Sequence, residues 1–242
     1  EPMADSSAIN VYILAKETKQ SVTVSLSGDG ADELFSGYNK HQALHFSLQK
    51  NFSNKAIKKL GRGAKFLPSS RNSKVGNIGR QIQKLHVGLN KNTLERYLEW
   101  ASFMDEKNIQ KLTQLNIDFN YVNEINHHKD EFNNFLFYDF NLVLDNDMLR
   151  KVDLMSMANS LEIRTPFLNH ELVKYVFSLP SSFKIDLKNR KKILKESFKD
   201  ILPSEVFNRK KHGFEVPLKK WFNNEMKLFL DQEIFNNNFL IS

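Results

Sequence analysis

The feature that most constrains the fold is a short β-rich run that leads into an acidic turn between two glycines. Residues 21–26 read Ser-Val-Thr-Val-Ser-Leu, and Gly28 and Gly30 bracket Asp29 directly afterwards. Helix-compatible sequence begins near Ala31. In α/β proteins a strand, a Gly-rich turn and a helix N-terminus in this order form ligand sites, because backbone N–H groups and the positive helix end converge there. The stretch therefore predicts an α/β element that carries a ligand site.

This turn carries more carboxylates than a simple phosphate cradle would. Asp29, Asp32 and Glu33 follow one another closely. Such a cluster is explained if Mg²⁺ lies between protein and phosphate, because Mg²⁺ is usually held by one or two carboxylates together with phosphate oxygens. An acidic first helical turn that only complements the helix dipole explains the same residues equally well. The spacing alone leaves both interpretations open.

Size and composition limit the classes of protein that the chain can represent. It has 242 residues, of which 40% are hydrophobic and 26% charged, which predicts one large or two small folded domains with Phe supplying much of the core. The absence of Cys excludes disulfides and cysteine chemistry. No apolar run is long enough to span a membrane and no signal peptide is evident, so we expect a cytoplasmic protein. Because the chain starts at Glu1, we expect it to belong to a longer protein.

The net charge of +7 comes from one segment. No acidic residue lies between Glu33 and Glu95, where twelve bases occur: Lys40, Lys50, Lys55, Lys58, Lys59, Arg62, Lys65, Arg71, Lys74, Arg80, Lys84 and Lys91. Without these twelve, 23 of the 35 Lys and Arg residues remain, fewer than the 28 Asp and Glu residues. Phe52 and Phe66 are the only aromatic residues in 49–91, whereas single-strand binders interleave aromatic and basic side chains. We therefore favour a solvated basic insertion over a nucleic-acid-binding module.

Helical spacing of apolar residues dominates the rest of the chain. It predicts a helix that starts after an N-cap in residues 5–7 and runs to about residue 19, and further helices over about 31–48, 92–117, 135–157, 170–178, 191–201 and 218–229. A second cationic cluster, Arg209-Lys210-Lys211, closes at Gly213, and lysines beside a Gly turn are good phosphate ligands. Motifs of P-loops, zinc proteases and serine hydrolases are all missing from the sequence.

Four stretches in order resemble the C-terminal synthetase domain of the glutamine-hydrolysing asparagine synthetases. They are residues 1–9, 26–38, 148–168 and 192–217, whereas residues 46–139 resemble nothing that we can place. The resemblance implies a helix-rich α/β fold, with a partial Rossmann-like sheet of the ATP-pyrophosphatase type and a mostly helical C-terminal portion. It also implies three regions: the C-terminal part of a nucleotide-binding α/β unit in 1–48, a basic insertion in 49–91, and the helical remainder of the synthetase domain in 92–242.

The resemblance implies a carbon–nitrogen ligase that joins ammonia to aspartate through a β-aspartyl-adenylate, with ATP and Mg²⁺ as cofactors and pyrophosphate as a product. The ammonia would come from glutamine through an N-terminal glutaminase domain, and a homodimer is compatible with it. That glutaminase domain and the family's Ser-Gly-Gly-x-Asp-Ser loop do not occur in this sequence. We therefore expect the chain by itself to be inactive.

The matching motif assigns roles to the acidic turn. Asp32 corresponds to the family's Mg²⁺-binding aspartate. Asp29 corresponds to the acidic position that faces the acyl-adenylate, where a carboxylate could deprotonate ammonia as a general base. Ser27, Gly28 and Gly30 would let the backbone approach the nucleotide or aspartate closely.

The C-terminal motifs add two lysines to the expected site. Lys211 corresponds to the lysine that stabilises charge on the phosphate and on the developing intermediate, an electrostatic contribution to catalysis. Lys192 is a second candidate for contact with phosphate.

Two alternatives to aspartate amidation stay open at this point. A related adenylating amidotransferase or a β-lactam-forming cyclase would use the same residues on another carboxylate. The alternative from another class is a nucleic-acid-binding module built on residues 49–91.

Overall fold

The computed structural model describes residues 3, 5–49, 63, 74–102, 104, 106–114, 130–208 and 216–234. The chain forms two compact units, each assembled from separated stretches. One, here called the strand unit, comprises Glu1–Leu26, Leu149–Arg164 and Arg209–Ser242. The other, here called the helical unit, comprises Ser27–Met148 and Thr165–Asn208. Among the described residues, no helix is long and apolar enough to cross a membrane.

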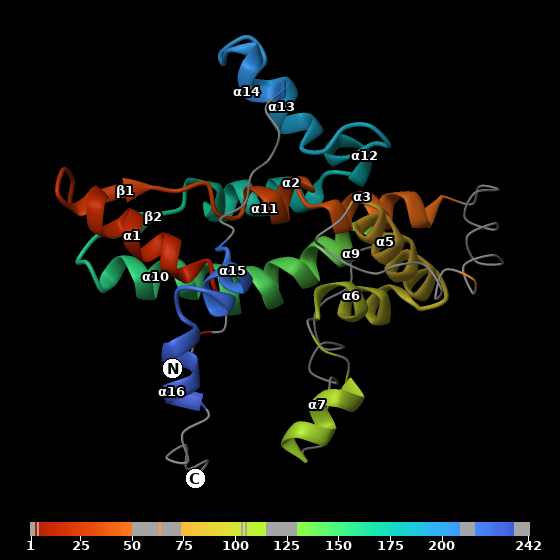
Figure 1. Cartoon of the computed structure of the whole chain (residues 1–242). Helices are drawn as coiled ribbons and strands as arrows, with labels where there is room; N and C mark the ends of the chain where they lie inside the picture. Colours follow the sequence, from red (N-terminus) through yellow and green to blue (C-terminus); the bar gives the residue numbers. More distant parts are fainter. Residues whose placement is uncertain are drawn as a thin grey trace. The chain divides into compact units, whose positions relative to one another are not determined.

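The strand unit combines a small parallel sheet with helices. Its elements are α1 (Ala8–Lys19), β1 (Val24–Leu26), α10 (Arg150–Met157), β2 (Glu162–Arg164), α15 (Leu218–Asn223) and α16 (Lys227–Ile234). Helix α1 lies along α10 and buries three small side chains, Ala8, Val11 and Ala15 (Figure 1). The predicted helix-rich α/β fold is confirmed at this level; a Rossmann-like sheet stays a prediction.

Strand β2 was not predicted from the sequence. It pairs in parallel with β1, with Val24 opposite Glu162 and Leu26 opposite Arg164, and the Glu162 amide donates to the Thr23 carbonyl at 3.1 Å. Parallel strands need a long crossover connection, so no local turn signal marks such a pairing. Alternation over three residues is also too short to distinguish a strand from a loop.

The helical unit contains the larger core. Its first elements are α2 (Ala31–Phe35), α3 (Asn39–Leu48), α5 (Lys74–Leu89), α6 (Thr93–Ala101), α7 (Glu106–Thr113), α9 (Glu131–Tyr138) and the π-helix η2 (Asp139–Leu149). The 3₁₀-helix η3 (Pro166–Leu168), α11 (His170–Ser178), α12 (Ser181–Lys184), α13 (Lys192–Phe198) and α14 (Ser204–Asn208) follow. Phe35, Phe132, Phe135 and Phe177 are all buried in this core, which confirms the predicted use of Phe.

The sequence predicted one helix over 31–48, but the structure breaks it into α2 and α3. Ser36 ends α2 in the left-handed conformation with φ of 63°. The Gly37 amide then donates back to the Asp32 carbonyl at 2.8 Å, the long bond of a Schellman-type helix end. The helix therefore ends at Phe35, and α3 begins only at Asn39.

The predicted helix over 135–157 is longer than expected and is not uniform. It begins at Glu131, because the Asp130 side chain caps the amides of Phe132 and Asn133. It then widens into the π-helix η2, where the Asn146 side-chain amide donates to two carbonyls of the preceding turn. π-Helical turns are rare and often occur at functional sites.

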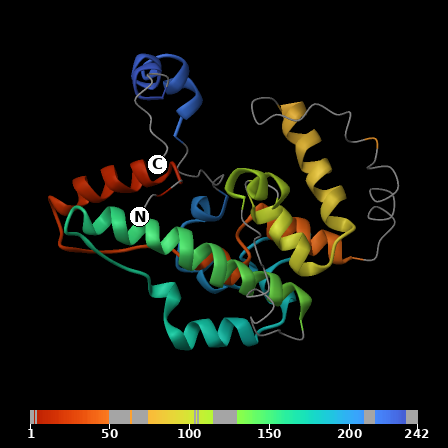
Figure 2. The ribbon, with the colours of Figure 1, turned by 90° about the horizontal axis from the view of Figure 1, so that it is seen from below.

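Most of the predicted basic insertion, residues 50–62 and 64–73, lies outside the described residues. Its last part forms α5, which packs against α6 (Figure 2). Asn92 caps α6 by accepting the Glu95 amide at 2.8 Å. The Trp100 indole donates to the Lys84 carbonyl at 2.9 Å, which fixes the ring between the two helices.

Candidate functional site

The acidic turn begins at Ser27, directly after β1 in the sequence. The Ser27 hydroxyl donates to Asp29 Oδ2 at 2.6 Å, and the Asp29 amide points to the same hydroxyl at 3.3 Å. This local ring of two bonds orients the Asp29 carboxylate, which is partly exposed. The carboxylate is therefore held in place yet within reach of a ligand.

The two glycines of the turn differ in whether the structure has room for a side chain at their position. Gly30 has φ of 87°, and a Cβ on it would lie 2.3 Å from Leu168 Cδ2. Leu168 belongs to η3, so this helix lies directly against the turn. Gly28 is exposed, and a Cβ there would meet no atom within 4 Å. The protein itself needs glycine at position 30, whereas the space at Gly28 is open.

The two acids of α2 lie in contrasting environments. Glu33 is 2% exposed and accepts the Tyr38 hydroxyl at 2.6 Å, and burial raises its pKa. The Asp32 side chain is 20% exposed, and Lys191 Nζ lies 2.8 Å from Asp32 Oδ1. Of this pair, Asp32 is the carboxylate that is paired with a cation and partly exposed.

Lys191 reaches Asp32 because of the backbone that precedes α13. Lys191 adopts φ of 54°, and its amide donates to the Phe35 carbonyl at 3.0 Å, which ties it to the end of α2. Next to it, Arg190 donates to the Gly37 carbonyl at 3.1 Å. A Cβ on Gly37 would lie 1.6 Å from Asp32 Oδ1, so the ion pair fits only against glycine.

Sequence reasoning chose Lys192 and missed Lys191. Lys192 is half-exposed, and its Nζ lies 3.4 Å from the Ser182 carbonyl and 3.8 Å from Asp186 Oδ2. Lys192 was selected through the family resemblance, and no pattern in the sequence indicated that the Lys191 ammonium reaches Asp32. Gly37 and Leu168 were likewise not assigned to the site.

The comparisons with known proteins settle the family. The model of the asparagine synthase family matches residues 1–239. The chain belongs to the asparagine synthase family. It is 34% identical over 235 residues to glutamine-hydrolysing asparagine synthetase 1 of Bacillus subtilis (strain 168), an alignment that covers 93% of this chain. It is also 35% identical over 95 residues, 36% of this chain, to the glutamine-hydrolysing asparagine synthetase of Gallus gallus.

The chain spans only part of these family members. The alignments cover 36% of the length of the Bacillus relative and 17% of that of the Gallus relative. A third relative, glutamine-hydrolysing asparagine synthetase 3 of Bacillus subtilis (strain 168), is 39% identical over 79 residues. The matched part of this chain therefore corresponds to only a portion of each of these relatives.

A metal would have to share this site with a ligand. Within the described ranges, no group of three or more His, Cys, Asp or Glu residues could hold a metal ion by itself. Asp32 offers one carboxylate, which already faces the Lys191 ammonium. This donor set fits Mg²⁺ held jointly by one carboxylate and phosphate oxygens, and does not fit a metal bound by the protein alone.

Lys211 and the rest of the predicted cationic cluster lie outside the described residues. The role assigned to Lys211 therefore stays a prediction. Among the predicted residues, Ser27, Gly28, Asp29, Gly30 and Asp32 lie together at the turn.

Proposed function

We propose that the chain is the synthetase portion of a glutamine-dependent asparagine synthetase. In this reaction aspartate and ATP form β-aspartyl-adenylate and pyrophosphate, and ammonia derived from glutamine then displaces AMP. The observation that carries the proposal is the Asp32–Lys191 pair beside the Asp29 carboxylate, in a chain whose family is established. An acidic and a cationic group at one turn suit a magnesium-bound polyphosphate.

Asp32 and Lys191 would act on the phosphates. Asp32 would hold Mg²⁺, which neutralises phosphate charge when bound. The Lys191 ammonium, 2.8 Å from that carboxylate, is a compact cation on a flexible stem and can turn from the carboxylate toward a phosphate oxygen. The left-handed backbone of Lys191 fixes where this stem starts.

Asp29 would act on the incoming ammonia. Its carboxylate accepts the Ser27 hydroxyl at 2.6 Å, which fixes its orientation before the substrate arrives. A carboxylate held in this way can take a proton from ammonia as it attacks the acyl group. The open space at Gly28 leaves room for a ligand to approach the backbone, and the backbone of Gly30 turns the chain at that point.

Several further assignments belong to the same proposal. Lys211 would stabilise charge on the phosphate and the intermediate, and Lys192 would be a second phosphate contact. We keep the regions 1–48, 49–91 and 92–242 as a proposal for the domain organisation. The partner would be a glutaminase domain; a homodimer and a cytoplasmic location stay predictions.

The test is aspartate-dependent exchange of labelled pyrophosphate into ATP by the intact protein. We expect exchange with aspartate and Mg²⁺, and its loss in the Asp32→Ala variant. Exchange with another carboxylic acid but not with aspartate would refute asparagine synthesis and favour a related adenylating enzyme. Exchange in Asp32→Ala that keeps its normal Mg²⁺ requirement would refute the metal role of Asp32.

A further inference from the structure

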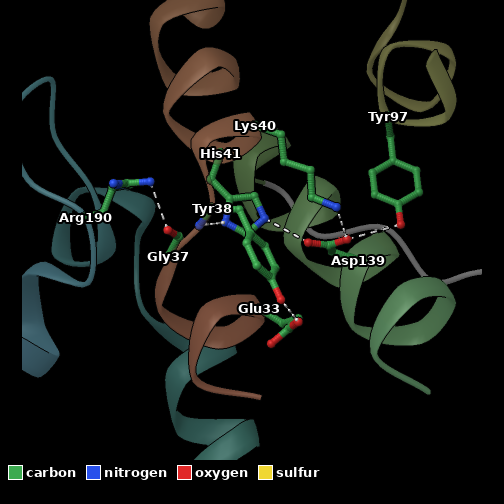
Figure 3. A network of polar contacts seen from close by, with 8 residues as sticks. All are labelled: Glu33, Gly37, Tyr38, Lys40, His41, Tyr97, Asp139 and Arg190. Atoms are coloured by element: carbon green, nitrogen blue, oxygen red, sulfur yellow. Dashed lines mark hydrogen bonds and ion pairs between the residues drawn. The ribbon is translucent and has the colours of Figure 1, made fainter. Parts of the chain in front are cut away.

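A buried carboxylate away from the turn gathers three donors. Asp139, the first residue of η2, is fully buried, and Figure 3 shows the side chains around it. Lys40 Nζ lies 2.5 Å from Asp139 Oδ1, and the Tyr97 hydroxyl donates to the same oxygen at 3.3 Å. His41 Nε2 lies 2.9 Å from Asp139 Oδ2. Two of these donors come from the first turn of α3.

The contacts of His41 define its tautomer. The Tyr38 amide points to His41 Nδ1 at 3.4 Å, so Nδ1 accepts and Nε2 carries the proton that is donated to Asp139. Burial lowers the pKa of His41 despite the nearby Asp139 carboxylate, so the ring is neutral at pH 7. Burial opposes the charge on Asp139, but the bonds from His41 and Lys40 still lower its pKa. Lys40 and Asp139 thus form the charged pair.

The network continues from α3 to α2. Tyr38, whose amide meets His41, donates its hydroxyl to Glu33 Oε1 at 2.6 Å. Lys40 Nζ also lies 5.3 Å from the centre of the Tyr38 ring. Glu33 is the neighbour of Asp32 on the five-residue helix α2. Side-chain contacts therefore connect Asp139 to the helix that carries Asp32.

We propose that Asp139 is a positioning residue for the acidic turn: through His41, Tyr38 and Glu33 it fixes the orientation of α2 and hence of the Asp32 carboxylate. The proposal rests on the proposed function, because it assigns Asp139 an effect on magnesium-nucleotide binding. A helix as short as α2 has few bonds of its own to set its direction. Besides the bond from Lys191 to the end of α2, the contact through Glu33 supplies a further point of attachment.

Stability alone does not explain this arrangement. Replacing a buried ion pair by well-packed apolar residues is often neutral or stabilising, so such a pair is weak evidence for a stabilising role. The polar network instead fixes the orientation of its side chains, because each hydrogen bond has a defined donor and acceptor. Outer residues that orient metal ligands commonly change metal affinity about 10- to 100-fold when replaced.

The experiment compares Asp139→Asn with Asp130→Ala in the intact protein. Asp130 precedes the same helical segment, and its side chain accepts the Phe132 amide and the Ser181 amide, both at 2.9 Å, without any contact to the network described above. MgATP binding is measured by titration calorimetry and folding by circular dichroism. We expect binding about 10-fold weaker in Asp139→Asn and unchanged in Asp130→Ala.

A milder variant keeps the test decisive if Asp139→Asn does not fold. Tyr38→Phe removes the hydroxyl that donates to Glu33 while it keeps the ring, and it should also weaken MgATP binding several-fold. In the ligand-free protein, ¹⁵N spectra should show His41 as the Nε2–H tautomer, and Asp139→Asn should shift that signal.

The outcomes separate the two proposals. If the wild-type protein does not bind MgATP, the proposed function and the positioning role fail together. If the wild type binds MgATP and folded Asp139→Asn and Tyr38→Phe bind it equally well, only the positioning role is refuted. Equal weakening in Asp139→Asn and Asp130→Ala would show a merely structural effect and would also refute it.

Discussion

Replacing Gly30 by Ala tests whether the acidic turn is built as described. The new Cβ would face two penalties. A side chain at φ of 87° costs about 1–2 kcal/mol, and contact with Leu168 Cδ2 at 2.3 Å forces repacking at about 1–3 kcal/mol. Together they predict that the free energy of unfolding of the turn falls by about 2–5 kcal/mol. The loss should be local, because Gly30 also accepts the Leu34 amide at 3.0 Å within α2.

Hydrogen exchange by mass spectrometry measures this local cost in a peptide that covers residues 27–38. A loss of 2 kcal/mol predicts exchange about 30-fold faster for the protected amides of α2. Gly28→Ala is the matched control, because its Cβ meets nothing within 4 Å and should leave exchange unchanged. Unchanged protection in Gly30→Ala, or equal loss in both variants, would contradict the described packing of the turn.

Three further predictions use the same structure. Gly37→Ala places a Cβ 1.6 Å from Asp32 Oδ1, so it should cost about 1–3 kcal/mol in urea unfolding and weaken MgATP binding in calorimetry; wild-type binding would contradict this. Lys191→Met should weaken MgATP binding about 10-fold or more, whereas Lys192→Met should have the smaller effect; the reverse order would contradict the placement of Lys191. Burial lowers the pKa of Lys184 from 10.5 to about 8. Between these two pH values the unfolded state binds more protons than the folded state. The free energy of unfolding should therefore rise with pH across that window, by up to about 1.4 kcal/mol per pH unit. Urea unfolding at pH 8 to 10.5 should show this slope, and it should flatten in Lys184→Met.

Local patterns in the sequence predicted the elements that depend on neighbouring residues. A helix was expected over 170–178, and the structure forms α11 there, capped by Asn169, whose side chain accepts the amides of Glu171 and Leu172. Strand β1 also lies within the predicted run 21–26, and α2 begins at Ala31 as expected. In each case apolar spacing, a capping side chain or a glycine turn determines the structure over a few residues.

One of the missed parts depends on an unusual local conformation, and the others depend on long-range contacts. The break after α2 depends on Ser36 adopting a left-handed conformation, which non-glycine residues rarely do. Strand β2 exists because it pairs with β1, far away in the sequence. The network at Asp139 joins α3 to η2, two elements that no local periodicity connects. No window of neighbouring residues contains the signals for the pairing of β2 or for the network at Asp139.

The choice between Lys191 and Lys192 shows how a single contact sets the chemistry of the turn. Both residues have the same side chain, so composition and charge cannot separate them. Their difference is that Lys191 precedes α13, where its amide donates to the Phe35 carbonyl and its backbone is left-handed, whereas Lys192 is the first residue of the helix. That bond to the end of α2 brings the Lys191 ammonium to Asp32. If the start of α13 moved by one residue, the neighbouring lysine would take the position at the bond to α2. The identity of the cation at the acidic turn therefore follows from where α13 begins. That start is set by tertiary structure and not by the basic residues 190–192 themselves.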